Sequence, residues 1–175
     1  TQQRTTTGST IKMLTSVSGL LNKVISINET IYDNVIFEKI VPSPSCHSKK
    51  GHGDQDFSNA IMNSCNYFFY DIGYKMSTQD GSYDAQTGLA TLEKYAAMYG
   101  LTSKSGVEIA ESTPHISNEL PVQSAIGQGT NNFTTVGLAR YVTAVANRGT
   151  VYDLTLLDKV TDSLSNVLIE YEPEV

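Results

Sequence analysis

The chain has 175 residues, a formal net charge of -6 and a hydrophobic content of 39%. Such an acidic composition excludes a nucleic-acid partner, because no basic patch is available to neutralise phosphates. The apolar residues form only short runs, so we expect no transmembrane span, and two cysteines are too few for a disulfide framework. The length suits one domain, or a piece of a larger one.

Apolar periodicity predicts a mostly helical chain. Apolar residues recur at three- and four-residue spacing over residues 9–25, which is the pattern of an amphipathic helix. Similar patterns, with an Asp N-cap and glycine stops, predict four later helices. These are expected from Asp56 through Met62, over residues 67–76, over 85–99 up to Gly100, and over 133–147 up to Gly149.

Strand signals are weaker and lie mainly near the C-terminus. Residues 151–157 and 167–171 alternate apolar and polar side chains, and residues 162–166 between them have the composition of a turn. The fold class is therefore α+β, mostly helical with a small β element at the end. The other non-helical segments are expected to be extended pieces within 28–40, a short strand or extended piece at 107–109, and loops at 46–55 and 112–123.

Ser9 and Lys12 form an S-x-x-K pair at the start of the first predicted helix. Three residues are nearly one helical turn, so the hydroxyl and the amine share a face. A serine hydroxyl becomes a nucleophile when an adjacent base takes its proton, and a lysine with a lowered pKa can be that base. By itself the pair is equally consistent with an ordinary solvated helix start.

A second polar motif, Ser64-Cys65-Asn66, separates two predicted helices. A hydroxyl and an amide on a tight interhelical turn can both point into one cleft. There Ser64 could shuttle a proton, and Asn66 could hold a substrate amide and the lysine. The alternative is a simple helix cap, because Ser and Asn are common at helix junctions.

Together the two motifs, S-x-x-K followed by S-x-N, form the pattern of penicillin-binding proteins and serine β-lactamases, and the residues that flank them resemble the class B, monofunctional penicillin-binding proteins. The resemblance implies a partial penicillin-binding-protein transpeptidase or serine β-lactamase-like fold over residues 1–175, with a helical subdomain and a small β element. Further segments similar to that family, in the same order, are residues 7–13, 52–53, 63–69, 125–129, 136–141 and 146–149.

The resemblance also implies a function, because members of this family crosslink peptidoglycan outside the cytoplasmic membrane. Ser9 would attack a D-Ala-D-Ala carbonyl or a β-lactam to form an acyl-serine, and Lys12 would take its proton. Ser64 and Asn66 would assist proton relay and substrate placement, and the backbone N–H of Ser9 would help to hold the oxyanion. The chemistry requires no cofactor. The parent protein is expected to be membrane-anchored at the extracytoplasmic face, within a cell-wall synthesis complex.

The family's third motif is K-T-G or K-S-G on a strand that lines the cleft. Lys104-Ser105-Gly106 matches it in composition but comes before the helix around Ala139, so we interpret this triplet as a structural segment. The third motif is then expected after Val175, and the chain is also expected to lack the strands that precede Ser9 in the family. The 175-residue chain alone should therefore acylate poorly or not at all.

Cys46, His52 and Cys65 are spaced C-x5-H-x12-C and form a candidate zinc site, with Asp33 as a candidate fourth ligand. Some class B relatives hold zinc beside the second motif with a carboxylate, a His and a Cys, and His52 and Cys65 fall at matching places. The alternatives are an ordinary loop His with a small buried Cys, or a Cys46–Cys65 disulfide.

Two other functions stay open at this point. A lysine-activated serine β-lactamase is disfavoured by the long loop between the first two motifs and by the Gly127-Gln128-Gly129 segment. Rapid nitrocefin turnover by the full-length parent would favour it. A non-catalytic β-lactam-sensing module would instead acylate, deacylate slowly and catalyse no transpeptidation.

Overall fold

The computed structural model describes residues 3–172, 174 and 175. In this part of the chain the fold is a group of helices with three small antiparallel strand pairs. The strands pair as β1–β4, β2–β3 and β5–β6. The elements in chain order are β1 (Arg4–Thr5), the 3-10 helix η1 (Gly8–Ile11), α1 (Lys12–Leu21), β2 (Ile31–Asp33), β3 (Gly53–Gln55), α2 (Phe57–Met62), α3 (Asn66–Met76), α4 (Ala85–Met98), α5 (Pro121–Ser124), β4 (Phe133–Thr134), α6 (Thr135–Ala146), β5 (Lys159–Thr161) and β6 (Val167–Glu170).

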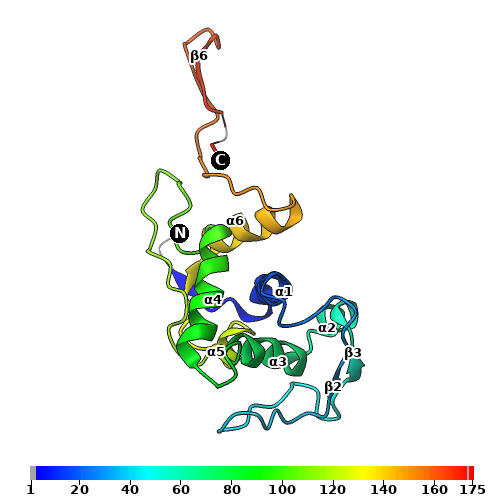
Figure 1. Cartoon of the computed structure of the whole chain (residues 1–175). Coiled ribbons are helices and arrows are strands. Elements are labelled where there is room, and N and C mark those ends of the chain that lie inside the picture. The colour runs from blue at the N-terminus through cyan, green and yellow to red at the C-terminus, as the bar shows by residue number, and fades with distance from the viewer. Residues whose placement is uncertain (1–2, 173) are drawn as a thin grey trace.

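Helices α1, α3, α4 and α5 pack against one another in the body of the molecule (Figure 1). The β2–β3 pair lies beside α2 at one end, and the β5–β6 hairpin projects from the opposite end (Figure 1). In the part of the chain that the structure describes, no helix has both the length and the apolar character needed to cross a bilayer.

Helix α3 is the centre of the larger apolar core. Its side chains Phe68, Phe69 and Ile72 are fully buried, because almost every face of this helix meets another element. Gly73 allows α5 to approach closely, since a Cβ at this position would lie 2.9 Å from the Cβ of Ala125. The larger core therefore fixes α3, which begins at Asn66 of the second motif.

A smaller core surrounds the first turn of α1. Ile11 and Leu14 are buried there against Phe133 and Tyr141, so the N-terminal end of α1 is held by α6 and β4. Burying an apolar side chain of this size contributes roughly 1.5–3 kcal/mol. The two cores lie at opposite ends of the helix that carries Lys12.

Side-chain N-caps define the starts of α2, α4 and α6. Asp56, Asp84 and Thr134 each accept a hydrogen bond from a backbone N–H in the first turn of their helix. The helices predicted at these three places, and the one over residues 67–76, are confirmed with ends that shift by at most two residues.

The first predicted helix is shorter and less uniform than expected. Residues 8–11 form a 3-10 turn and the α-helix ends at Leu21, so the predicted span of 9–25 is too long. Asn22 caps α1, and Lys23 takes a left-handed backbone conformation with φ of 58°. The apolar spacing continued past this point because Val24 and Ile25 pack on the larger core without being helical.

The strand predicted over residues 151–157 is wrong. Only Asp153 forms a bridge there, with Glu174. Arg140 of α6 takes the carbonyl of Tyr152 at 2.6 Å and the carboxylate of Asp153 at 2.5 Å. The bond to the carbonyl of Tyr152, and the 2.8 Å bond from the N–H of Leu154 to the carbonyl of Ser105, use backbone groups that a strand ladder would need.

Residues 107–109 also lie outside any strand. The carboxylate of Glu108 accepts hydrogen bonds from the N–H of Leu156, at 3.0 Å, and from the hydroxyl of Thr155. Two segments predicted as loops contain regular structure instead: β3 lies within 46–55, and α5 begins inside 112–123. Both β3 and α5 are too short for a periodic pattern in the sequence to predict them.

The C-terminal hairpin is confirmed, although its first strand lies later in the chain than predicted. β5 and β6 pair antiparallel around the expected turn at 162–166, and every residue of both strands is exposed. Leu164 at the tip is 80% exposed. The alternating sequence pattern does form a strand here, but among the described residues no layer buries the apolar side of the hairpin.

Candidate active site

Ser9 lies on the 3-10 turn that precedes α1, and Lys12 is the first residue of α1. A 3-10 helix has three residues per turn, so positions 9 and 12 lie directly above one another. Ser9 is exposed, whereas the side chain of Lys12 points inward and is 3% exposed. The S-x-x-K pair thus combines an accessible hydroxyl with a buried amine.

The amine of Lys12 is held by the second motif. Its Nζ donates to the carbonyl of Ser64 at 2.7 Å, to Oγ of Ser64 at 2.9 Å, and to Oδ1 of Asn66 at 2.7 Å. Oγ of Ser64 also lies 2.8 Å from Oγ of Ser9. The structure therefore brings together all four residues that the sequence selected, Ser9, Lys12, Ser64 and Asn66, and we call them the nucleophile cluster.

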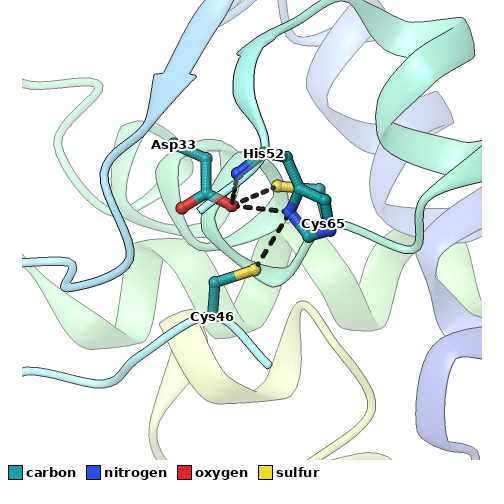
Figure 2. Close-up of side chains that lie close together, drawn as sticks. All are labelled: Asp33, Cys46, His52 and Cys65. Atoms are coloured by element: carbon teal, nitrogen blue, oxygen red, sulfur yellow. Dashed lines mark hydrogen bonds and ion pairs between the residues drawn. The ribbon is translucent and has the colours of Figure 1, made fainter. Parts of the chain in front are cut away.

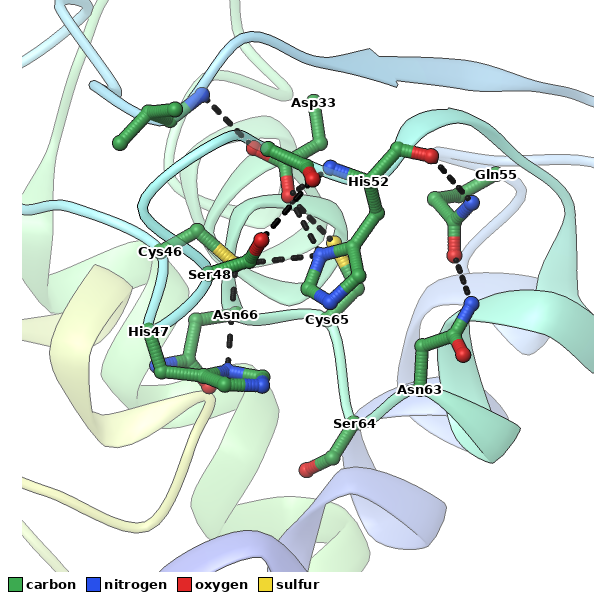
Figure 3. A network of polar contacts seen from close by, with 12 residues as sticks. Asp33, Cys46, His47, Ser48, His52, Gln55, Asn63, Ser64, Cys65 and Asn66 are labelled. Carbon is green, nitrogen blue, oxygen red and sulfur yellow. Dashed lines mark hydrogen bonds and ion pairs between the residues drawn. The ribbon is translucent and has the colours of Figure 1, made fainter.

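The second motif is a strained turn between two helices. α2 ends at Met62, and Ser64 adopts φ of 51°, a left-handed conformation that non-glycine residues adopt at a cost of order 1–3 kcal/mol. The N–H of Cys65 bonds the carbonyl of Ala60 at 2.9 Å, and α3 begins at the next residue. This turn directs Ser64 and Asn66 toward Lys12. Cys65 faces away from Ser64, toward Asp33 and His52 (Figure 3).

Burial changes the acidity of Lys12. Removal from water disfavours the charged amine and lowers its pKa from 10.5 to about 8, although the nearby Cys65 and Cys46 act in the opposite direction. The ring of Phe69, whose centroid is 5.4 Å from Nζ, forms part of the apolar surroundings. An amine with this pKa can exchange a proton near neutral pH, as a general base must.

A glycine turn closes the site next to Ser9. Gly127 has φ of 82°, and a Cβ on it would lie 2.1 Å from the carbonyl oxygen of Gly8. The neighbouring Thr15 hydroxyl donates to the carbonyl of Ala125 at 2.7 Å. Family resemblance located this turn in the sequence, but its direct packing on the residue before Ser9 was not predicted.

The triplet Lys104-Ser105-Gly106 lies in different surroundings. Ser105 is completely buried, and its N–H and hydroxyl both bond Oε2 of Glu111, at 2.7 and 2.8 Å. The carbonyl of Lys104 accepts a hydrogen bond from Arg140. A hydroxyl fixed in this way cannot face a substrate, which agrees with the interpretation of the triplet as a structural segment.

A second polar cluster lies around Cys65, the middle residue of the second motif (Figure 2). Its members are Asp33, Cys46, His52 and Cys65, whose ligand atoms all lie within 4.8 Å of one another; we call it the donor cluster. Oδ2 of Asp33 is 2.7 Å from Nδ1 of His52 and 3.3 Å from Sγ of Cys65, and Nδ1 of His52 is 3.5 Å from Sγ of Cys46. Both cysteines are free thiols.

The donor cluster has the composition of a zinc site. Two sulfurs, one imidazole nitrogen and one carboxylate oxygen are ligands that zinc accepts in a tetrahedral arrangement. The N–H groups of Val35 and His52 bond the carboxylate of Asp33 at 2.8 and 3.1 Å, so backbone donors orient this carboxylate, as a metal ligand would require. The residues present therefore fit the metal.

Comparison with known proteins gives the family. A family model of the penicillin-binding protein transpeptidase domain matches residues 1–174. The chain belongs to this family. It is 26% identical over 163 residues to the peptidoglycan D,D-transpeptidase MrdA of Haemophilus influenzae, covering 82% of this chain and 23% of that protein. It is 28% identical over 153 residues to stage V sporulation protein D of Bacillus subtilis, covering 83% of this chain and 22% of that protein.

Solved structures of penicillin-binding proteins have the same fold as this transpeptidase segment. Penicillin-binding protein 2B of Streptococcus pneumoniae matches with a TM-score of 0.80 at 21% identity, covering 98% of this chain and 31% of that chain. The Helicobacter pylori protein PBP2, solved in complex with MreC, matches with a TM-score of 0.75 at 24% identity, covering 87% of this chain and 29% of that chain. The predicted class B resemblance and the partial transpeptidase fold are confirmed, and the chain spans less than a quarter of the length of these two curated relatives.

Proposed function

We propose that Ser9 is the acyl acceptor of a peptidoglycan D,D-transpeptidase, with Lys12 as its base. The observation that carries this proposal is the chain of contacts from Nζ of Lys12 to Oγ of Ser64, at 2.9 Å, and on to Oγ of Ser9, at 2.8 Å. It connects an exposed hydroxyl to a buried amine whose pKa is lowered to about 8. The substrate is the D-Ala-D-Ala end of a stem peptide, and β-lactams compete for the same serine.

In the proposed acylation, Oγ of Ser9 bonds to the carbonyl carbon of the penultimate D-Ala. The proton of Ser9 passes to Ser64 as the proton of Ser64 passes to neutral Lys12. The backbone N–H of Ser9 stabilises the oxyanion, and collapse of the tetrahedral intermediate expels the terminal D-Ala. The amine of the departing D-Ala takes the proton back from Lys12 through Ser64.

The second half of the reaction reverses these proton movements. The amine of another stem peptide attacks the acyl-serine, its proton returns through Ser64 to Lys12, and Ser9 leaves with a proton regained from the same residues. Asn66 holds Lys12 through Oδ1, and the amide on the same side chain is a donor for a substrate carbonyl.

We also propose that the third motif of the family lies outside these 175 residues, in the rest of a single transpeptidase domain. The burial of Ser105 supports this, because no other K-S-G or K-T-G triplet occurs in the chain. The chain alone should then react with β-lactams far more slowly than the full-length protein.

Labelling with a fluorescent penicillin tests the proposal. The full-length protein should be labelled with one penicillin per chain, Ser9→Ala should lose the label, and Ser58→Ala, the same change at an exposed position of α2, should keep it. Labelling of the Ser9→Ala variant would overturn the assignment. Stoichiometric labelling of the 175-residue chain would overturn the placement of the third motif. Rapid turnover of nitrocefin by the full-length protein would indicate a β-lactamase. Stable acylation of the full-length protein without transpeptidation would indicate a β-lactam sensor.

We propose further that the donor cluster binds one structural zinc ion. Asp33, Cys46, His52 and Cys65 would hold it, and bound zinc would offset most of the negative charge of the carboxylate and the two thiolates and fix Cys65 next to Ser64. Elemental analysis of the full-length protein should find one zinc per chain, which Cys46→Ser should lose. Protein without zinc, in which both thiols react with a maleimide, would contradict this proposal.

The parent protein is proposed to be anchored in the cytoplasmic membrane and to act at its outer face in a cell-wall synthesis complex. Support comes from relatives: the Helicobacter pylori PBP2 was solved in complex with MreC, and another matching structure is of a peptidoglycan synthase complex. Fractionation of cells, followed by protease treatment of spheroplasts, should find this domain in the membrane fraction and accessible from outside.

A further inference from the structure

The hydroxyl of Tyr141 lies inside the hydrogen-bond ladder of the helix that carries the nucleophile. The N–H of Leu14 donates to Oη of Tyr141 at 2.9 Å, and Oη donates to the carbonyl of Thr10 at 3.1 Å. Tyr141 comes from α6, far along the chain from α1, and is only 1% exposed. Its hydroxyl is therefore placed in this turn by the tertiary structure.

In a continuous α-helix the N–H of Leu14 would bond the carbonyl of Thr10 directly, because the ladder runs from residue i to i-4. Insertion of a side chain between the two groups is one of the recognised ways to interrupt or bend a helix. The interruption coincides with the change from the 3-10 turn, Gly8–Ile11, to the α-helix that starts at Lys12.

We propose that Tyr141 is a positioning residue for the nucleophile: its hydroxyl keeps the turn that carries Ser9 in 3-10 geometry, so that Ser9 meets Ser64 while Lys12 stays buried. The proposal rests on the proposed role of Ser9 as acyl acceptor. The two groups bridged by Oη lie on either side of Lys12, and one of them belongs to the residue directly after Ser9.

The reason is geometric. Each residue advances by about 120° in a 3-10 helix, with 3.0 residues per turn, and by about 100° in an α-helix, with 3.6. If the ladder closed directly between Leu14 and Thr10, the first turn would become α-helical and Ser9 would rotate relative to Lys12. Oγ of Ser9 would then leave the 2.8 Å contact with Ser64.

The surroundings of Tyr141 favour this role over simple core filling. The ring packs in the smaller core, where Tyr99 meets it edge-on at a centroid distance of 5.8 Å, and a phenylalanine ring would fill that space equally well. Burial raises the pKa of Tyr141, so the hydroxyl stays protonated and can donate to Thr10 while accepting from Leu14. The two hydrogen bonds of the hydroxyl go to backbone groups on either side of the junction between the 3-10 turn and α1.

The test measures β-lactam acylation of the full-length protein under saturating conditions, which separates the acylation rate constant from the affinity of the prior non-covalent complex. Tyr141→Phe should lower the rate constant about 10- to 100-fold with little change in affinity, because small displacements of reacting groups cost about this much. Two control variants should keep the wild-type rate constant: Tyr99→Phe, which removes a hydroxyl next to the same ring, and Val145→Ala, which weakens the same core.

A rate constant for Tyr141→Phe within twofold of the wild-type value would overturn the proposal, as would an equal loss in Val145→Ala at matched stability. Incorporation of 4-aminophenylalanine at position 141 restores a polar bridging group and should return the rate constant to within threefold. Failure of that variant to do so would also count against the proposal, whether or not Tyr141→Phe folds. Ser9→Ala in the same assay separates the two ideas, because acylation of that variant contradicts the proposed function itself.

Discussion

The nucleophile cluster and the donor cluster lie on the two sides of one turn, residues 64–66, and their charged groups have different surroundings. In the nucleophile cluster the cationic amine of Lys12 meets only neutral oxygens of Ser64 and Asn66, and burial lowers its pKa to about 8. In the donor cluster burial opposes ionisation of Asp33, but hydrogen bonds from Val35 and from the neighbouring side chains outweigh it and lower the pKa. One cluster is thus suited to exchange a proton, and the other to keep a fixed charge.

The thiols reinforce this difference. Burial raises the pKa of Cys65, so without a metal its sulfur is a protonated thiol that donates to Asp33 at 3.3 Å. Without a metal, Cys65 therefore has little thiolate character near neutral pH. Adjacent residues of one turn, Ser64 and Cys65, thus contact groups of opposite charge: Ser64 contacts the amine of Lys12, and Cys65 contacts the carboxylate of Asp33.

The largest effect is expected from removing the base. Lys12→Met should lower β-lactam acylation of the full-length protein about 10²- to 10⁴-fold, the usual contribution of a general base. Lys23→Met makes the same change at an exposed residue past the end of α1 and should have no effect. Stopped-flow measurement of acylation checks this, and near-normal acylation of Lys12→Met would remove Lys12 from the mechanism.

The pH dependence should follow Lys12. The neutral amine is the active form, so with a pKa of about 8 the acylation rate constant should rise through pH 8 and level off above it. Below pH 8 it should fall about tenfold per unit, because the neutral fraction falls in that proportion. A profile that is flat between pH 6 and 9 would mean that another group takes the proton.

Breaking the donor cluster should reduce the stability of the fold more than the rate of acylation. Asp33→Asn removes the negative oxygen shared by His52 and Cys65, and should cost about 2 kcal/mol of unfolding free energy, or roughly 4–8 °C in melting temperature. Zinc content should fall, and acylation should change less than in Lys12→Met. The matched control is Asp54→Asn, an exposed carboxylate on β3, and equal losses in both variants would argue against a special role for Asp33.

The smallest effect should come from the contact that ties the turn to β3. Asn63→Ala removes the bond from its side-chain amide to Oε1 of Gln55, at 2.9 Å, and should cost about 1 kcal/mol. Urea unfolding measures this cost. Acylation should stay within twofold of wild type, and a tenfold loss would show that the two clusters depend on each other through this residue.

Much of the nucleophile cluster could be predicted because its information is local. The spacing of Ser9 and Lys12 within one turn, and the S-x-N triplet between helices, are properties of short segments, as are the N-caps at Asp56 and Asp84. The strand expected at 151–157 failed for the opposite reason. Arg140, from a different element, binds the backbone of that segment, and no local pattern records such a contact.

The sequence by itself predicted the four residues that meet in the nucleophile cluster and a mostly helical chain, because motif spacing and helix periodicity act over a few residues. Only the tertiary structure decided that Ser64 lies between Ser9 and Lys12 and that Tyr141 enters the first turn of α1. It also brought Asp33, which the sequence offered as a candidate ligand, next to the cysteines and His52. These contacts join segments far apart in the chain. They form because burying Phe68 and Leu14 in their separate cores fixes α3, α6 and α1 relative to one another.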